Sequence, residues 1–256
     1  MDAMGKRIIG LTLSGGGARG YAHIGVLKAL EEAQMFPKIV SGTSMGAIIG
    51  ALIANGYSAS DIGAMAKNRR HGKIFHIRGV WDGISSHKHV KTILEALLPT
   101  KFEDLKLPIY VSTTNLDRAQ HEVFSKGNLI DAILASISIP LVFKPIFING
   151  YRYADGGLVK NLPASSIRQH CDVLIGSHVN HLNEGFKANN VINLLDRCMR
   201  IAIANTLSHD KTLCDIYIDP KGGGSYGVFD FSIVDEIIDF GYQAAKKELI
   251  SSGSEL

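Results

Sequence analysis

Short apolar runs alternate with longer stretches in which apolar residues recur every three or four positions, and this pattern continues along most of the chain. The runs are typical of buried strands, and the longer stretches are typical of amphipathic helices. The pattern predicts strands at Ile8–Leu13, Ile39–Val40, Pro108–Thr114, Glu122–Phe124, Cys171–Val179 and Cys214–Ile218. It predicts helices after Gly20 and after Gly46, and at Ser58–Arg69, Ser86–Leu98, Leu129–Ile137, Val191–Leu207 and Ser232–Ile250. Strands that alternate with helices in this way indicate an α/β fold with a mostly parallel sheet.

No internal repeat, low-complexity tract or linker interrupts this pattern. A length of 256 residues suits one large α/β domain, so we expect residues 1–256 to form a single domain. Hydrophobic residues make up 46% of the chain and charged residues 20%, which is typical of a globular protein. The most apolar long segment, Ile39–Ala54, is interrupted by serine and glycine and is too short to span a membrane.

The charge and the cysteines narrow the classes of partner. A formal net charge of +3 is too small to indicate a nucleic-acid partner, although it permits a mild preference for anionic surfaces. The three cysteines are scattered and suggest a reducing compartment, and the apolar run after Lys6-Arg7 is too short for a signal sequence. We therefore expect a cytoplasmic protein. Transient contact with a membrane surface would make it peripheral to the membrane. The sequence does not indicate an oligomeric state.

One stretch suits such a contact with a lipid surface. Between Lys67 and Trp81, basic residues are interleaved with aromatic ones, a composition that can dock on lipid headgroups. A solvated helix end followed by a loop is the interpretation that we favour for this stretch.

The sequence around Ser44 has the form of a nucleophile elbow. Gly42, Ser44 and Gly46 fit the pattern G-x-S-x-G, placed between a buried strand and an apolar helix. A strand that turns sharply into a helix holds its central residue in a strained conformation, and the flanking positions must lack a Cβ because the two arms of the turn nearly touch. Unpaired N–H groups at the start of the helix favour a developing anion. We interpret Ser44 as a nucleophile; the alternative is an ordinary glycine-serine turn.

A second turn from strand to helix contains three consecutive glycines, Gly15, Gly16 and Gly17. Such a loop lets backbone N–H groups approach a reacting carbonyl and form an oxyanion hole. With Gly20 it also fits the dinucleotide fingerprint G-x-G-x-x-G, but the second strand does not end in the acid that this fingerprint requires. Arg19 binds an anionic substrate group, buttresses the loop, or is a solvated side chain, and its position in the sequence does not decide between these roles. Both turns follow parallel strands, so we expect them at the same edge of the sheet.

A serine nucleophile requires a base. In the usual chain order of hydrolases an acid follows the serine and a histidine follows the acid. From spacing alone, a triad with His178 or His181 is favoured, because His178 ends a predicted strand. The sequence Asp155-Gly156-Gly157 is by itself a common turn. His87 and His89 lack a matching third ligand, so we predict no metal site.

Four blocks, taken together, resemble the patatin-like acyl hydrolases, in particular their bacterial branch. They occur in the family's order, and the resemblance extends nearly from end to end: Ser14–Gly20, Gly42–Gly46, Ala135–Pro140 and Asp155–Gly157. The resemblance implies a three-layer α/β/α sandwich with a mostly parallel central sheet. It also implies hydrolysis of fatty-acyl esters, phospholipids among them, by an enzyme without a metal ion or cofactor.

The resemblance further implies a Ser–Asp dyad without a histidine in the catalytic step. Ser44 is then the nucleophile and Asp155 is its base. The oxyanion hole is implied to consist of Gly15, Gly16, Gly17 and Arg19, and the supporting glycines of the motifs are Gly42, Gly46, Gly156 and Gly157. A carboxylate is a weak base unless burial raises its pKa, and we expect Tyr153, Leu158 and Val159 to supply the apolar surroundings.

Two departures from the family's pattern put the choice of substrate in doubt. Leu141 stands where many relatives have glycine, and Lys160 replaces a small polar residue.

Two alternative functions remain open. Transfer of the acyl group to an acceptor other than water would use the same residues. An inactive lipid- or nucleotide-binding protein on this scaffold is another alternative, which the intact serine, aspartate and glycine loop disfavour.

Overall fold

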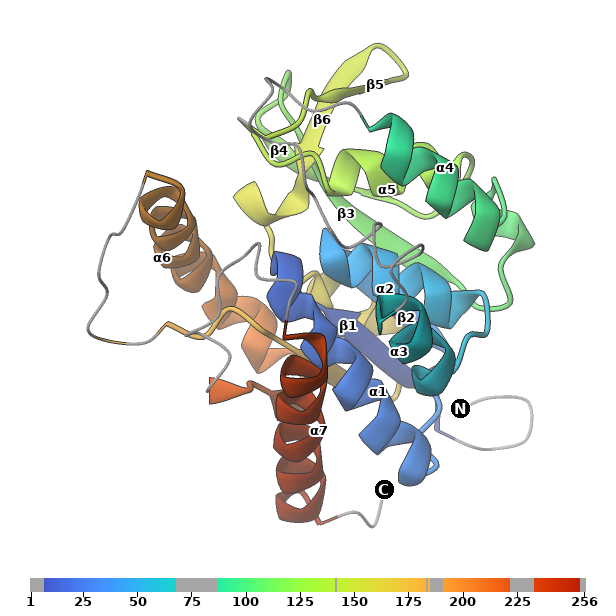
Figure 1. Cartoon of the computed structure of the whole chain (residues 1–256), viewed down its shortest axis with the longest axis vertical. Coiled ribbons are helices and arrows are strands. Elements are labelled where there is room, and N and C mark those ends of the chain that lie inside the picture. The colour runs from blue at the N-terminus through green and yellow to red at the C-terminus, as the bar shows by residue number, and fades with distance from the viewer. Residues whose placement is uncertain are drawn as a thin grey trace.

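The computed structural model describes residues 7–67, 87–140, 142–182, 184, 191–221 and 233–253. Eight strands form one sheet in the order β5-β6-β3-β2-β1-β7-β8, with β4 beside β3 (Figure 1). The strands are β1 Ile9–Leu13, β2 Ile39–Thr43, β3 Ile109–Asn115, β4 Gln120–Phe124, β5 Ile146–Ile148, β6 Tyr151–Asp155, β7 Val173–Ser177 and β8 Ile216–Ile218. The helices are α1 Ala22–Glu32, α2 Met45–Ala54, α3 Ala59–Lys67, α4 Lys88–Leu97, α5 Leu129–Ser136, α6 Val191–Thr212 and α7 Val234–Ser251.

The centre of the sheet is parallel, as the alternation of strands and helices predicted. Strands β3, β2, β1, β7 and β8 pair in parallel, whereas β4, β5 and β6 pair antiparallel at the β3 end. The hydrophobic pattern did not predict β5 and β6. The signal for them is Asn149-Gly150, whose φ angles of 50° and 88° are typical of a two-residue hairpin turn.

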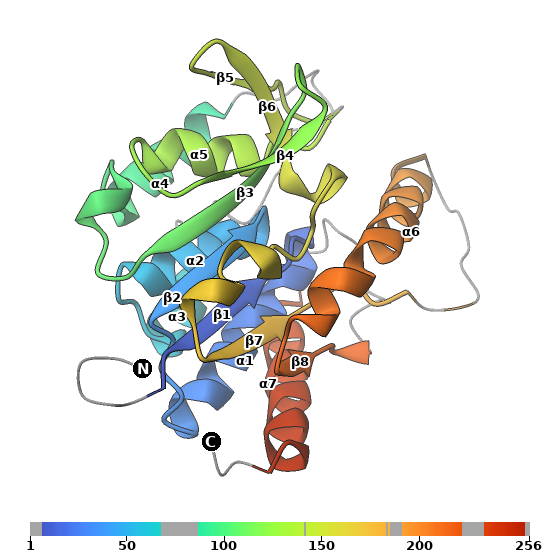
Figure 2. The same ribbon diagram turned by 180° about the vertical axis from the view of Figure 1, so that it is seen from behind.

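Helices cover both faces of the sheet, which confirms the three-layer arrangement. Helices α1, α2, α5 and α7 lie on one face in Figure 1, and α6 lies beyond the other face in Figure 2 together with the short turns at 164–166 and 168–170. The first face contains the larger apolar core. The second contains a smaller cluster built on Ile39, Ala164, Ile167 and Leu174.

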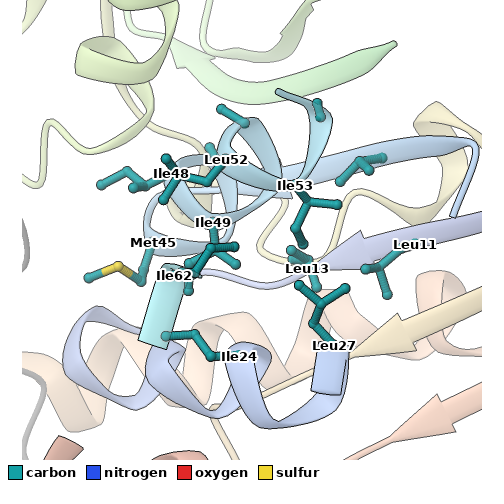
Figure 3. Packing of buried hydrophobic residues seen from close by; sticks show 14 of the residues in the cluster. Leu11, Leu13, Ile24, Leu27, Met45, Ile48, Ile49, Leu52, Ile53 and Ile62 are labelled. Atoms are coloured by element: carbon teal, nitrogen blue, oxygen red, sulfur yellow. The ribbon is translucent and has the colours of Figure 1, made fainter. Parts of the chain in front are cut away.

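Helix α2 occupies the middle of the larger core. All ten of its residues are buried, because it packs on the sheet below and on α1 and α5 beside it. Figure 3 shows Ile49 and Leu52 of α2 among Leu13 of β1 and Ile24 of α1. A helix that is apolar on every side is held by neighbours on every side. The residue before α2, Ser44, is therefore fixed to the rigid centre of the molecule.

Most predicted elements are confirmed within a few residues, and α6 extends five residues beyond its predicted end at Leu207. The basic and aromatic stretch after Lys67 lies almost entirely outside the described residues. Leu141 also lies outside them.

Candidate active site

The pairing of β3 with its neighbours brings the ends of two distant strands together. Residues 111–112 of β3 pair with both β2 and β4, and residues 113–115 pair with both β4 and β6. Because a strand has two edges, β2 and β6 must share the edge opposite β4. Thr43, the last residue of β2, lies opposite Ser112, and Asp155, the last residue of β6, lies opposite Thr113. The two strands run toward each other and end at consecutive residues of β3, so Ser44 and Asp155 are neighbours.

The turn at Ser44 has the strained geometry of an elbow. Ser44 has φ 53° and ψ −120°, in a region that residues with a side chain rarely adopt. A Cβ on Gly42 would lie 2.3 Å from the carbonyl oxygen of Gly46, so the two arms of the turn do nearly touch. A Cβ on Gly46 would instead lie 2.5 Å from the carbonyl oxygen of Leu13, at the end of β1. Gly46 is thus required by the neighbouring strand rather than by its own turn.

The Asp155 carboxylate faces the Ser44 side chain and is almost fully buried. Burial raises the pKa of Asp155 from 3.8 to about 6, while hydrogen bonds from the Ser44 side chain and from the Gly157 N–H act in the opposite direction. The Gly157 N–H lies 2.7 Å from Asp155 Oδ1. A carboxylate that is shielded from water and oriented by a backbone donor is a stronger base than an exposed one.

The surroundings of Asp155 differ in part from those expected. Tyr153 is buried as expected, but Leu158 and Val159 are 38% and 36% exposed and are not the buried apolar neighbours that we expected. The backbone of Asp155 is held in place by the segment after α5, since the Asp155 N–H donates to the Ser138 carbonyl at 3.0 Å. Gly156 permits this packing, because a Cβ there would lie 2.5 Å from the Ser112 carbonyl oxygen.

The glycine loop lies directly beside Ser44, since a Cβ on Gly15 would be 3.2 Å from Ser44 Cβ. The Gly15 N–H donates to the Asn161 carbonyl at 3.3 Å. Within the described residues, the N–H groups of Gly16 and Gly17 have no hydrogen-bond partner. These two N–H groups are thus free to donate to a ligand, and Gly17 takes a left-handed φ of 56°.

Arg19 is not solvated: its side chain is 2% exposed. It forms a two-pronged ion pair with Asp196 of α6, with Nη2–Oδ1 and Nη1–Oδ2 distances of 2.8 and 3.2 Å. Its Nε and its backbone N–H approach the Gly16 carbonyl oxygen at 3.3 and 3.2 Å. Of the roles left open by the sequence, this arrangement corresponds to a buttress of the loop.

Lys160 points away from the loop. Its Nζ lies 3.2 Å from Asp210 Oδ2 and donates to Ser165 Oγ at 2.9 Å, so its charge is paired on the second face of the sheet.

The histidines favoured by spacing alone are not bonded to Ser44 in the described part of the chain. His181 Nδ1 lies 2.9 Å from Asp219 Oδ2. His178 is 3% exposed, its ring nitrogens have no hydrogen-bond partner among the described residues, and its Nδ1 is 3.8 Å from Asp219 Oδ1. The triad favoured by spacing is therefore not assembled.

No role was predicted from the sequence for three polar side chains at this site, Ser136, Asn161 and Asn180. Ser136 Oγ accepts the Ser44 N–H at 2.8 Å and donates to the Ser112 carbonyl at 2.7 Å. Asn180 Nδ2 donates to the Gly15 carbonyl at 2.6 Å and to Asn161 Oδ1 at 3.0 Å. Ser136 belongs to the block Ala135–Pro140, and that membership was the only signal in the sequence for any of the three.

No three histidine, cysteine or acidic side chains of the described ranges gather as metal ligands. Of the helices that the structure describes, none has the length and apolarity needed to cross a membrane.

The chain is similar to known proteins in sequence and in fold. Residues 11–167 match the family model described as patatin-like phospholipase. The chain is 30% identical over 268 residues to lysophospholipase NTE1 of Kluyveromyces lactis, covering 91% of this chain and 18% of that protein. It is 31% identical over 277 residues to lysophospholipase nte1 of Emericella nidulans, covering 95% of this chain and again 18% of the relative. The fold is similar to that of VipD from Legionella pneumophila, with a TM-score of 0.58 at 16% identity over 96% of this chain and 67% of that one.

Proposed function

Because the chain belongs to the patatin-like phospholipase family, we propose that it is a lipid acyl-ester hydrolase in which Ser44 is the nucleophile and Asp155 the general base. The observation that supports this most is the strained turn that holds Ser44 against a buried carboxylate of raised pKa. The names of the two curated relatives make a lysophospholipid the first substrate to test. The chain spans only 18% of their length, so their remaining segments contribute nothing to this proposal.

The proposed reaction begins with transfer of the Ser44 proton to Asp155. The Ser44 oxygen attacks the carbonyl carbon of the ester, and the N–H groups of Gly16 and Gly17 stabilise the oxyanion that forms. When the tetrahedral intermediate collapses, the bond to the alcohol breaks and Asp155 returns the proton to the leaving oxygen. Asp155 then takes a proton from water as the water oxygen attacks the acyl-enzyme. When the bond between the acyl group and Ser44 breaks, Asp155 returns this proton to the Ser44 oxygen and the fatty acid leaves. These steps use no metal ion or organic cofactor.

Contact with a lipid surface is part of the proposal. Leu158 and Val159 are exposed and follow the Asp155-Gly156-Gly157 turn directly. Apolar side chains at this position suit a site whose substrate must leave a lipid layer. Replacing both with serine should weaken sedimentation with phosphatidylcholine vesicles but should not alter turnover of a water-soluble short-chain ester.

The test of the proposed chemistry compares the wild type with Ser44→Ala and Asp155→Asn on lysophosphatidylcholine, phosphatidylcholine and short-chain esters. Both variants should release no fatty acid above background, and a fluorophosphonate probe should modify Ser44 of the wild type, as read by peptide mass spectrometry. Asp239→Asn, an exposed carboxylate on α7, is the matched control. Fatty-acid release that survives in purified Ser44→Ala would disprove the proposal.

A further inference from the structure

The buried ion pair between Arg19 and Asp196 joins two segments that lie 177 residues apart in the sequence. Arg19 lies in the short helical turn Gly17–Tyr21 of the glycine loop, whereas Asp196 belongs to α6, which projects from the body of the molecule in Figures 1 and 2. The Asp196 side chain is 18% exposed, and its carboxylate contacts both η nitrogens of Arg19. An arginine held at two points by one carboxylate has a fixed orientation as well as a neutralised charge.

The orientation of Arg19 bears directly on the loop. A peptide bond is planar, so the carbonyl of one residue and the N–H of the next point in opposite directions and turn together. The Gly16 carbonyl and the Gly17 N–H belong to one such plane, and Arg19 Nε contacts that carbonyl oxygen at 3.3 Å. The direction of the Gly17 N–H is thus linked to the position of the Arg19 side chain.

The preceding peptide is held in the same way from another side. The Gly15 carbonyl accepts hydrogen bonds from Asn180 Nδ2 at 2.6 Å and from Ser14 Oγ at 3.0 Å, and this carbonyl shares its plane with the Gly16 N–H. Glycine permits rotation of these planes at little cost. Side chains that grip the carbonyls are therefore what keeps the two N–H groups in place.

Asp196 is itself positioned within α6. Arg200, one helical turn further on, approaches Asp196 Oδ2 with its Nη1 at 3.7 Å and donates through Nη2 to the His181 carbonyl at 2.5 Å. The carboxylate that orients Arg19 is consequently tied to the segment after β7, which also contains Asn180. Both peptide planes of the loop depend on this side of the molecule.

We infer that Asp196 is a positioning residue for the oxyanion hole: through Arg19 it fixes the Gly16–Gly17 peptide, so that helix α6 controls the alignment of the Gly17 N–H. This inference rests on the proposed function, because it assigns a role to the loop in stabilising an oxyanion. It differs from a purely structural role in which the ion pair only stabilises the fold.

The first experiment compares Asp196→Asn and Arg19→Lys with the wild type and with the control Asp239→Asn, all as full chains. The kcat on a short-chain ester should fall about 10- to 100-fold, with KM within about twofold, because a misdirected donor weakens the transition state rather than substrate binding. Asp196→Glu, which keeps the charge, should recover part of the lost kcat. Equal kcat values in Asp196→Asn and the wild type would overturn the inference.

A thionoester analogue separates positioning from general damage. Its sulfur accepts hydrogen bonds poorly, so an intact oxyanion hole favours the oxygen ester over the thionoester. The rate on the oxygen ester divided by the rate on the thionoester should fall about tenfold in Asp196→Asn. The variant loses the stabilisation of the oxyanion by the loop N–H groups, and only the oxygen ester depends strongly on it. An unchanged ratio with both rates lowered would mean that the ion pair is structural, which also overturns the inference.

Stability and the nucleophile are measured in parallel. Thermal unfolding shows whether each variant is folded at the assay temperature. If Asp196→Asn is unfolded, the test relies on Asp196→Glu and Arg19→Lys, which keep both charges of the buried pair. Ser44→Ala separates the two hypotheses. If Ser44→Ala is active, the proposed function fails. If it is inactive while all Asp196 and Arg19 variants retain the wild-type kcat and rate ratio, only the inference about Asp196 fails.

Discussion

The backbone N–H of Ser44 donates to the hydroxyl of Ser136 at a distance of 2.8 Å, and the same hydroxyl donates to the Ser112 carbonyl at 2.7 Å. One side chain at the end of α5 thus ties the strained turn to β3. The strain at Ser44 requires such restraint, because an unsupported turn would relax to an unstrained backbone.

Replacing Ser136 with alanine should therefore impair both stability and catalysis. The Ser44 N–H loses its buried acceptor, so the free energy of unfolding should fall by about 1–3 kcal/mol. We expect kcat to fall about tenfold while KM changes little, since the nucleophile loses its alignment. Chemical denaturation and steady-state kinetics measure the two effects, with the exposed Ser252→Ala as control. A variant with wild-type kcat would show that Ser136 does not hold the turn.

The raised pKa of Asp155 predicts the pH dependence of activity. Because the proposed base must be ionised, kcat/KM should rise with pH through an apparent pKa of about 6 and then level off. A profile of kcat/KM on an uncharged ester from pH 4 upward measures this value. A midpoint near 4, the value for an exposed aspartate, would contradict the assigned environment.

The same group affects stability in the opposite direction. The pKa of Asp155 is higher in the folded protein than its ordinary value of 3.8, so its contribution to stability is fully present below about 3.8 and is lost as the pH rises through about 6. Asp155→Asn removes this ionisation. As the pH rises between these two values, the wild type should therefore lose unfolding free energy relative to Asp155→Asn. Urea titrations at each pH measure this difference. An equal pH dependence in both proteins would exclude this linkage.

The placement of the histidines predicts a contrast between two single substitutions. Asp155→Asn should lower kcat about 10³-fold or more, because the serine loses its base. His178→Ala should retain most of the wild-type kcat, because His178 faces Asp219 and Tyr217 rather than Ser44. Kinetics on one ester, with circular dichroism to verify folding, make the comparison. Loss of activity in a folded His178→Ala variant would restore the triad.

The space around two glycines predicts opposite effects on folding. A Cβ on Gly42 would lie 2.3 Å from the Gly46 carbonyl oxygen, so Gly42→Ala should destabilise the protein by more than about 4 kcal/mol or prevent folding. Gly63 lies in helix α3, where an added Cβ would be 3.8 Å from the Ile24 side chain. Gly63→Ala should stabilise the protein by about 1 kcal/mol. Thermal unfolding ranks the three proteins, and similar melting temperatures for both variants would refute the steric argument.

Much of the fold follows from the sequence because its determinants are local. The alternation of apolar runs and amphipathic stretches gave the parallel centre of the sheet and most of its helices. The two arms of the turn at Ser44 are four residues apart, so their steric conflict could be recognised from Gly42 and Gly46 alone, although the carbonyl that excludes a Cβ at Gly46 comes from β1. The hairpin of β5 and β6 was missed because only the pair Asn149-Gly150 signals it.

By itself, the sequence determined most of the helices and strands, the strained turn and the glycine loop, since each depends on neighbours along the chain. Which carboxylate faces Ser44 depends instead on the register of β3, where two strands more than a hundred residues apart end at Ser112 and Thr113. The same holds for the burial of Arg19 against Asp196 and for the position of His178 away from the serine. Such contacts arise when the chain closes on itself, and spacing along the chain does not determine them, because loops of very different length can join the same two points in space.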